Sequence, residues 1–302
     1  MKTALVTGSA GFVGRHMTAE LNSRGWHVTE CDQFDVNGRP VDQDALRIFR
    51  KHGGPRYDLV VHCAARAPHR AAIDGQPMNL AYNLQLDAAM FEWAVRTRQR
   101  RVLYLSSSAV YPVSFQDGSE ATEWKLHEVH TDSPLGIMPD AGYGWTKLTG
   151  EKMAAAAAAE GLAVHVVRPF SGYGEDQGED WPFGAFLARA LRREDPFTIW
   201  GDGRQVRDWI HIEDVVAGAL AVVDADVRDP VNLCTGRGAS MTELAGMIVA
   251  ETGYQPWVAY EPKAPSGVAY RVGDPDRFHD IYVPKVSLEE GVARAVRREV
   301  PA

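Results

Sequence analysis

Short runs typical of strands recur through the first half of the chain, separated by segments whose apolar residues have helical spacing, and the run Leu59–Cys63 shows no polar alternation. The runs predict strands at Ala4–Val6, His27–Cys31, Leu59–Cys63, Arg101–Leu105 and Leu162–Val167, with Phe34–Val36 as a candidate short strand. The segments between them predict helices at Arg15–Ser23, Asp42–Lys51, Asn79–Thr97 and Tyr143–Glu160. Such strands are typical of a parallel sheet covered by helices on both faces. The pattern therefore predicts an α/β fold built on a doubly wound parallel sheet.

The character of the sequence changes after Pro169, because Gly, Pro, Asp and Glu cluster between residues 172 and 182. Beyond this cluster the pattern predicts helices at Phe183–Arg193, Val215–Val223 and Thr242–Thr252, and strands at Phe197–Trp200 and Val231–Cys234. We predict a larger domain of residues 1–169, to which residues 208–236 return. Residues 170–207 and 237–302 are predicted to form a smaller C-terminal substrate-binding lobe.

Three glycines lie between the first predicted strand and the first predicted helix. Gly8, Gly11 and Gly14 place a tight turn at a helix N-terminus, where backbone N–H groups favour a pyrophosphate. Asp32 ends the second strand 18 residues after Gly14, in the range where a carboxylate accepts hydrogen bonds from an adenosine ribose. These features predict a dinucleotide-binding Rossmann unit, and the alternative is a glycine-rich turn with a surface aspartate.

The amino-acid composition limits the kinds of partner and the cellular compartment that we expect for the protein. The chain has 302 residues and a formal net charge of −8, which argues against nucleic acid or an anionic membrane as the main partner. Three widely spaced cysteines, Cys31, Cys63 and Cys234, are typical of reduced thiols and offer no metal site. No apolar run reaches the length of a signal peptide or a membrane span. A cytoplasmic protein is therefore expected.

One predicted helix carries candidate chemistry. Tyr143 and Lys147 are four residues apart and share a helix face, so the lysine ammonium favours the phenolate form of the tyrosine. A phenolate is suited to general-base catalysis. The serines at 106–108 end a strand at the same sheet edge as the Gly8 turn, where a hydroxyl can bind a substrate oxygen. The alternative is a tyrosine and a lysine that share a helix face without function.

At this point the sequence resembles the extended short-chain dehydrogenase/reductases, and within them the NAD-dependent epimerase/dehydratase family that acts on nucleotide-sugars, of the UDP-glucose 4-epimerase type. The resemblance spans nearly the whole chain. It rests on the glycine turn, Asp32, His62–Ala65, Asn83, Ser106–Tyr111, the Tyr143–Lys147 pair, Arg168–Pro169 and the segment Gly201–Asp214.

The resemblance implies roles for particular residues. Tyr143 would be the base, Lys147 would bind the nicotinamide ribose, and Ser107 would hold the sugar oxygen. The implied NAD-binding residues are Gly8, Gly11, Phe12, Val13, Gly14, Asp32, Asp35, Val36, Ala64, Ala65, Asn83, Tyr143, Lys147 and Pro169. The implied substrate-binding residues are Ser108, Ser171, Arg207 and Arg271, with Arg207 at the nucleotide diphosphate. An arginine fork matches phosphate oxygens, and surface arginines in solvent are the alternative.

Two departures from the family pattern bear on specificity. Ser171 stands where the family usually has asparagine, which bears on the choice of nucleotide. Ser108 and Ala109 occupy positions where 4,6-dehydratases place Asp-Glu, and where two related enzyme types have a cysteine at the position of Ala109. The site thus lacks the carboxylate or thiol that those reactions use.

The sequence therefore predicts an NAD-dependent nucleotide-sugar 4-epimerase that works through a transient 4-keto sugar. The alternatives are a nucleotide-sugar ketoreductase or dehydrogenase with the same catalytic residues, and a non-catalytic NAD sensor or scaffold. His62 is interpreted as structural or cofactor-packing, whereas His69, His127 and Glu123 are reserve candidates for an acid or base. A homodimer is expected through the helices at 79–97 and 143–160. The nucleotide and the sugar stay open.

Overall fold

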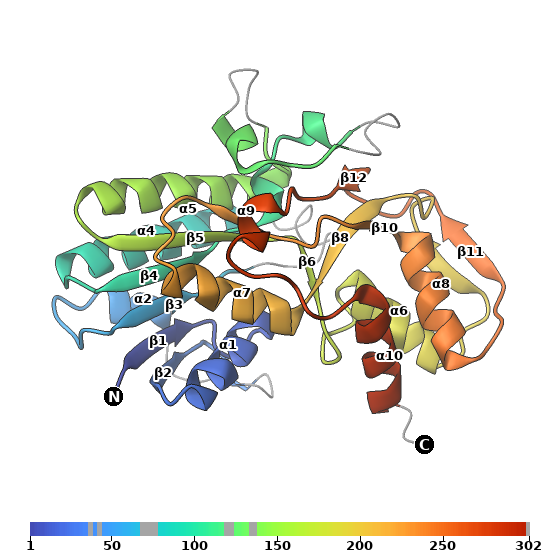
Figure 1. Cartoon of the computed structure of the whole chain (residues 1–302), viewed down its shortest axis with the longest axis horizontal. Helices are drawn as coiled ribbons and strands as arrows, with labels where there is room; N and C mark the ends of the chain where they lie inside the picture. Colours follow the sequence, from blue (N-terminus) through green and yellow to red (C-terminus); the bar gives the residue numbers. More distant parts are fainter. Residues whose placement is uncertain (36–38, 41–43, 67–77, 118–123, 133–137, 300–302) are drawn as a thin grey trace.

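A six-stranded parallel sheet forms the larger half of the computed structural model (Figure 1). The structure describes every residue except 36–38, 41–43, 67–77, 118–123, 133–137 and 300–302. The strands, in chain order, are β1 (Thr3–Thr7), β2 (His27–Cys31), β3 (Leu59–His62), β4 (Arg101–Leu105), β5 (Ala163–Pro169) and β9 (Val231–Leu233). Their order across the sheet is β2-β1-β3-β4-β5-β9, and every neighbouring pair is parallel.

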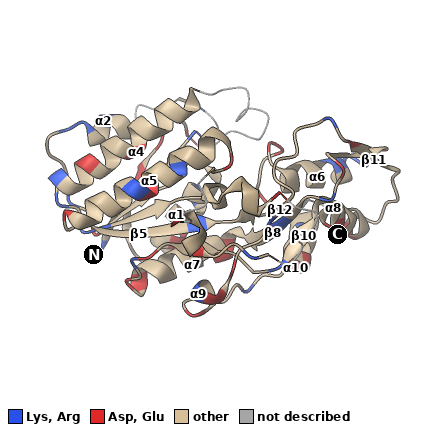
Figure 2. Ribbon diagram, turned by 90° about the horizontal axis from the view of Figure 1, so that it is seen from above, with Lys and Arg blue, Asp and Glu red and all other residues tan. Residues whose placement is uncertain are grey.

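Helices cover both faces of this sheet, which confirms the predicted doubly wound architecture (Figures 1 and 2). Helices α1 (Phe12–Ser23) and α7 (Ile212–Asp224) bury apolar residues against one face, including Met17, Leu21 and Val216. Helices α2 (Ala45–Phe49), α4 (Asn79–Arg96) and α5 (Ala141–Ala159) cover the other face. Each strand buried in this way contributes apolar side chains to two cores, so its sequence shows no polar alternation.

The strand order reverses between β1 and β3. From β1 the chain passes to β2 on one side, and it then crosses back so that β3 pairs with the other edge of β1. The connections after β1 and β3 therefore leave in opposite directions and open a crevice outside the carboxyl ends of the strands, where ligands bind in open α/β sheets.

Helix α5 packs unusually close to β4. A β carbon at Gly150 would overlap the Tyr104 hydroxyl oxygen and would lie 2.9 Å from a carboxylate oxygen of Asp87. The alanine run in the second half of α5 is helical, as its propensity predicts, and Ala154 and Ala157 are buried against the sheet.

The C-terminal part of the chain builds a second layer of structure beside the large sheet. Its strands are β6 (Ser171–Tyr173), β7 (Phe197–Trp200), β8 (Val206–His211), β10 (Gly238–Ser240), β11 (Val258–Glu261) and β12 (Tyr270–Arg271). Its helices are α6 (Pro182–Leu191), α8 (Met241–Thr252) and α10 (Leu288–Glu299). The short helix α9 (Asp276–His279) returns to the large sheet, because Phe278 is buried in the core that α1 and α7 cover. Strand β8 pairs with β6, β10 and β12, and β7 pairs with β11. A separate apolar core, including Phe186, Phe197, Leu244 and Val292, holds these elements together.

The structure corrects several details of the sequence prediction. Phe34 forms only an isolated bridge with Pro40, so the candidate strand there is wrong in its described part, and Val36 lies outside the described residues. Strand β8 belongs to the second sheet, so the chain returns to the large sheet with α7 rather than at residue 208. Helix α10 and strands β6, β8, β10, β11 and β12 were not predicted. The assignment of the two parts as functional domains stays a prediction.

Replacing Gly150 with alanine should destabilise the protein, because the added methyl group must displace Tyr104 or shift α5 away from β4. Overpacking of this kind typically costs about 1–3 kcal/mol of the free energy of unfolding, measurable by urea titration. Gly246→Ala in α8 is the matched control, because nothing lies within 4 Å of the added carbon. Alanine is the better helix former, so that variant should gain up to about 1 kcal/mol. Equal stabilities of the two variants would contradict the predicted clash.

Candidate active site

The turn after β1 brings backbone groups close to a potential ligand. Gly8 has a φ of +70°, in the left-handed region that favours glycine. A β carbon at Gly14 would overlap the Gly8 carbonyl oxygen, so α1 can start this close to the turn only without a side chain there. Among the described residues no side chain caps the N-terminus of α1, which leaves its first N–H groups suited to an anion. The Asp32 carboxylate accepts a hydrogen bond from the Ala10 N–H, 2.9 Å away, and so lies against this turn.

A cavity of about 680 Å³ extends from the glycine turn, past the ends of β4 and β5, to the C-terminal part of the chain. Most of the predicted site residues line it. These are Gly8, Gly11, Phe12, Val13, Gly14, Ala65, Ser107, Ser108, Tyr143, Lys147, Pro169, Ser171, Arg207 and Arg271. The fold thus gathers into one cavity residues that are far apart in the sequence.

Ser107, Tyr143 and Lys147 lie where β4 ends and α5 begins. Ser107 precedes the short 3-10 helix η1 (Ser108–Val110), and its hydroxyl oxygen accepts a hydrogen bond from the Ala109 N–H. The buried Lys147 ammonium donates to the Leu105 carbonyl oxygen at 2.7 Å and lies 5.9 Å from the centre of the Tyr143 ring. The ammonium is therefore fixed on the strand end with the Tyr143 ring on the same helix face.

Three arginines of the C-terminal part of the chain line the cavity: Arg189 in α6, Arg207 in β8 and Arg271 in β12. Gln205, Arg207 and Trp209 alternate along β8 and its preceding residue, and all three line the cavity, as residues on one strand face do. Arg207 donates to the carbonyl oxygens of Val206 and Ser266. Arg271 is held more tightly, because it donates to the Gln116 side chain and forms a 2.8 Å ion pair with Asp140.

Some predicted cofactor residues do not line the cavity. Asp32, Asp35, Ala64 and Asn83 lie outside the lining, and Val36 is not among the described residues. The buried Asn83 amide accepts from the Arg66 N–H and donates to the Arg66 carbonyl oxygen, so in this structure it braces the segment after β3. An Asp35 carboxylate oxygen accepts from the Arg39 N–H. The assignment of these residues to a cofactor stays a prediction.

The histidines and Glu123 that the sequence analysis considered as acids or bases either do not line the cavity or are not among the described residues. His62 is fully buried, and its ring nitrogens contact the Thr7 hydroxyl at 2.8 Å and the Asp87 carboxylate at 3.1 Å. This geometry agrees with a structural histidine. His127 is half exposed, 3.5 Å from a carboxylate oxygen of Asp274, and does not line the cavity. His69 and Glu123 lie outside the described residues.

The sequence analysis missed the wall of the cavity formed by the C-terminal part of the chain. Its aromatic members are Phe170, Trp181, Phe186, Trp200 and Trp209, and its polar members include Gln177, Glu179, Asp180, Arg189 and Gln205. The alternation along β8 was a usable signal for Gln205 and Trp209. The others come from loops and helix ends that only the tertiary fold brings together.

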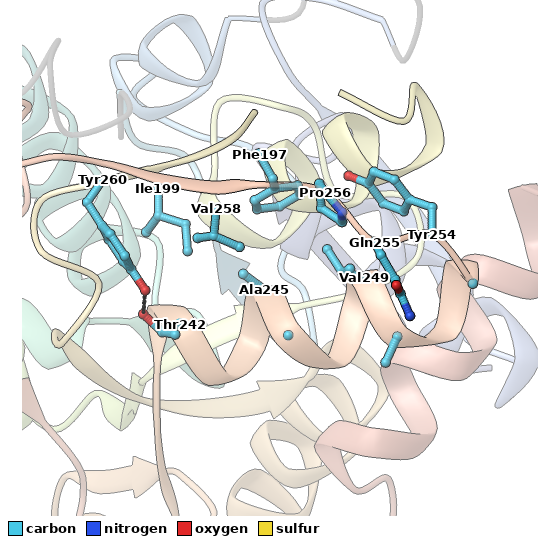
Figure 3. A pocket seen from close by; sticks show the side chains of 13 residues that line it. Phe197, Ile199, Thr242, Ala245, Val249, Tyr254, Gln255, Pro256, Val258 and Tyr260 are labelled. Carbon is cyan, nitrogen blue, oxygen red and sulfur yellow. Dashed lines mark hydrogen bonds between the residues drawn. The ribbon is translucent and has the colours of Figure 1, made fainter. Parts of the chain in front are cut away.

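A second hollow, of about 540 Å³, lies between α8 and the β7–β11 pair (Figure 3). Its described lining consists of apolar residues with a few neutral polar groups, such as the Thr242 and Tyr260 hydroxyls, which are 3.2 Å apart. No charged side chain is among these lining residues.

Searches for other kinds of site gave two findings. Within the described part of the chain, no three His, Cys, Asp or Glu side chains gather closely enough to hold a metal ion. None of the described helices combines the length and the apolar composition needed to cross a membrane.

Comparisons with known proteins identify proteins that are similar to this chain in sequence and in fold. A family model described as the NAD-dependent epimerase/dehydratase family matches residues 4–234. A dTDP-4-dehydro-6-deoxy-D-allose reductase from a Streptomyces species is 27% identical, over 93% of this chain and 90% of the reductase. The structure of UDP-glucose 4-epimerase from Thermotoga maritima is similar, with a TM-score of 0.81 and 26% identity over 98% of this chain and 97% of the epimerase. MoeE5 in complex with UDP-glucose and NAD also has a TM-score of 0.81, with 28% identity and 99% of each chain covered.

Proposed function

The chain belongs to the NAD-dependent epimerase/dehydratase family, and from this premise we propose that it is a nucleotide-sugar 4-epimerase. The family comprises nucleotide-sugar epimerases, dehydratases and reductases, which share a fold and differ in the groups around the sugar. The observation that carries the choice is the combination of Ser107, Tyr143 and Lys147 in the cavity with Ser108 and Ala109 beside them, where a dehydratase needs an acid and a base.

The residues at the glycine turn fit NAD, the cofactor of the family. The side-chain-free approach of Gly14 to Gly8 leaves room for a pyrophosphate at the N-terminus of α1, and Asp32 beside the turn would accept hydrogen bonds from the adenosine ribose. Lys147 would bind the nicotinamide ribose. When bound, NAD supplies the reversible hydride acceptor that oxidation at C4 of the sugar requires.

The proton chemistry falls to residues of this chain. Tyr143 takes the proton of the C4 hydroxyl as its carbon is oxidised, and returns it when the 4-keto sugar is reduced from the other face. The Lys147 ammonium, held on the Leu105 carbonyl oxygen, lies on the same helix face as the Tyr143 ring, 5.9 Å from its centre. The Ser107 hydroxyl holds the sugar oxygen. The sugar must turn over between the two hydride transfers, so few groups should bind it tightly.

Three of the other titratable groups that line the cavity are poorly suited to abstract a proton from the sugar ring: Cys63, Asp140 and Glu179, whose carboxylate accepts hydrogen bonds from Arg192. Desolvation raises the pKa of the Cys63 thiol to about 12, so the thiolate is scarce at neutral pH. The Asp140 carboxylate is held in its ion pair with Arg271. C4 epimerisation needs one base and a ketone free to rotate, whereas dehydration or inversion at C5 needs a further acid or base beside the sugar ring.

The substrate class follows from the cationic side of the cavity. Arg207 presents a guanidinium fork from β8, and such a fork matches diphosphate oxygens through charge-assisted hydrogen bonds. Arg271 lines the same cavity. An anionic ligand is consistent with this local positive charge, although the whole chain carries a net charge of −8.

A nucleotide-sugar ketoreductase is the second candidate, because the Streptomyces relative that matches over most of both chains is a reductase of a 4-dehydro sugar. The two functions use the same catalytic residues and differ in what happens to the cofactor. An epimerase regenerates its cofactor in each turnover, whereas a reductase consumes reduced cofactor. A steady fall in NAD(P)H absorbance with a 4-keto nucleotide-sugar would favour the reductase.

The protein should bind NAD more tightly than NADP, because the Asp32 carboxylate repels a 2′-phosphate. Arg15, the basic residue nearest the turn in sequence, forms a 2.8 Å ion pair with Asp176. Isothermal titration with both cofactors measures the preference. Asp32→Ala should weaken NAD binding and narrow the difference. Tighter binding of NADP by the unaltered protein would refute the role of Asp32.

Tyr143→Phe should lower kcat by about 10² or more, since general acid–base catalysis typically contributes 10²–10⁴. NAD affinity and melting temperature should change little, because only a hydroxyl in a partly exposed position is removed. Turnover is measured with UDP-glucose, the ligand bound in the MoeE5 structure, and with GDP-, dTDP- and CDP-sugars. Tyr260→Phe, at the remote hollow, is the matched control and should retain activity. Full activity of Tyr143→Phe would exclude the tyrosine as the base.

Turnover in D₂O should leave the carbon-bound hydrogens of the sugar unexchanged and the product mass equal to the substrate mass. The reason is that hydride returns to the same carbon it left, and Ser108 and Ala109 provide no group to exchange a C3 or C5 hydrogen. Mass spectrometry of the product measures both properties. Deuterium on a ring carbon, or a product lighter by the mass of water, would exclude the 4-epimerase.

A further inference from the structure

A buried polar cluster lies directly behind the candidate catalytic residues, and the mechanism above does not use it. We call it the Arg168 cluster. Its members are Ser106, Tyr111, Glu128, Thr131, Glu151, Arg168 and Asn232, and each is buried. They come from β4, η1, η3 (Glu128–Asp132), α5, β5 and β9 or from the residues next to them.

Arg168 at the end of β5 is the centre of this cluster. It is 1% exposed, and all five of its N–H groups donate hydrogen bonds. Two form a fork onto the Glu151 carboxylate, at 2.9 and 2.7 Å. The others go to the Tyr111 hydroxyl, the Glu128 carbonyl oxygen and the Thr131 hydroxyl, at 2.9–3.0 Å. The planar guanidinium therefore defines both the distance and the orientation of the Glu151 carboxylate. A lysine ammonium has no such planar fork and would not define the orientation.

Glu151 connects this anchor to the catalytic helix face. Tyr143, Lys147 and Glu151 are spaced by four residues in α5 and so follow one face of the helix. Lys147 donates to the Leu105 carbonyl oxygen, and the Glu151 carboxylate accepts a 2.5 Å hydrogen bond from the Ser106 hydroxyl. The helix is thus attached to two successive residues at the end of β4. The next residue in the chain is Ser107.

A buried ion pair of this kind is an inefficient way to stabilise a fold. Desolvation of the two charges offsets much of their attraction, and well-packed apolar residues often stabilise as much or more. Apolar contacts are non-directional, whereas the arginine–carboxylate fork and the serine hydroxyl define distance and angle. The geometry of the pair therefore points to placement of the helix rather than to stability.

We propose that Arg168 and Glu151 are positioning residues, which set the register of α5 so that Tyr143 faces the same substrate oxygen as Ser107. This inference rests on the proposed function, since it assigns the pair to the proton transfer at that oxygen. Neither residue touches the substrate. Their effect on the reaction passes through Lys147, Tyr143 and Ser107.

The test compares Arg168→Lys and Glu151→Gln with the double variant Arg168→Met/Glu151→Met, which replaces both charges by apolar side chains. We expect the double variant to fold and to bind NAD and UDP-glucose with nearly unaltered affinity. Its kcat should fall about 10²-fold, the effect typical of a misplacement of about 1 Å in a catalytic group. Arg168→Lys keeps the charge without the fork and should lose kcat with little change in KM. Glu151→Gln keeps most of the shape and should lose less.

Gln99→Leu is the matched control for a purely structural effect. Gln99 is also buried, and its amide bonds to the Tyr57 N–H, the Pro55 carbonyl oxygen and the Thr97 hydroxyl, away from the cavity. It should lower the melting temperature while kcat, measured well below that temperature, stays at the wild-type value. Wild-type kcat in the Arg168 and Glu151 variants, or an equal loss of kcat in Gln99→Leu, would overturn the inference.

Failure of the proposed function would look different, because the unaltered enzyme would then turn over none of the nucleotide-sugars. In that case crystals of the double variant decide the inference through the position of α5 relative to β4. A displacement of the Tyr143 hydroxyl from Ser107 by about 1 Å, the scale on which catalytic geometry matters, supports it. An unmoved Tyr143 contradicts it.

Discussion

The reversal of strand order between β1 and β3 is the constraint on which the site depends. The connections after β1 and β3 leave in opposite directions, although the two strands are parallel neighbours. A crevice therefore opens beyond the carboxyl ends of these two strands. The glycine turn after β1 and the segment after β3 meet at this crevice. A β carbon at Gly8 would come within 2.7 Å of the Ala64 nitrogen, so the two connections are in close contact. The position of a cofactor is thus a consequence of topology before any side chain is considered.

The candidate catalytic residues lie at the other side of the crevice, where α5 approaches β4. Three successive features of the helix meet the strand: Lys147 bonds to the Leu105 carbonyl oxygen, the missing side chain of Gly150 accommodates Tyr104, and Glu151 bonds to Ser106. Close packing makes small displacements costly in both directions. The two hydrogen bonds hold α5, and with it Tyr143, in place relative to the end of β4.

The C-terminal part of the chain completes the cavity with a different kind of surface. This part contributes aromatic rings and arginines to the lining of the cavity, whereas the large sheet and its loops contribute glycines and hydroxyl groups. Strand β8 and the residue before it place Gln205, Arg207 and Trp209 in the cavity, while Asp208 between them accepts hydrogen bonds from the backbone N–H groups of Thr235, Gly236 and Gly273. One strand therefore presents cavity-lining groups and also holds together the segments around it.

The sequence by itself determined the doubly wound sheet, the glycine turn and the pairing of Tyr143 with Lys147, because these follow from local periodicity and short spacings that survive in any context. It indicated Arg207 through a resemblance, and the cavity lining includes it. It did not predict helix α10, although Leu288, Val292, Ala295 and Val296 have helical spacing and are buried. Only the tertiary structure decided that Asn83 braces the Arg66 backbone, that Arg271 pairs with Asp140, and that Arg168 reaches Glu151. Those partners are 17 to 131 residues apart in the sequence. A charged or amide side chain can pair with many others, and its actual partner depends on which groups the fold brings within hydrogen-bonding distance. No local sequence pattern encodes that proximity.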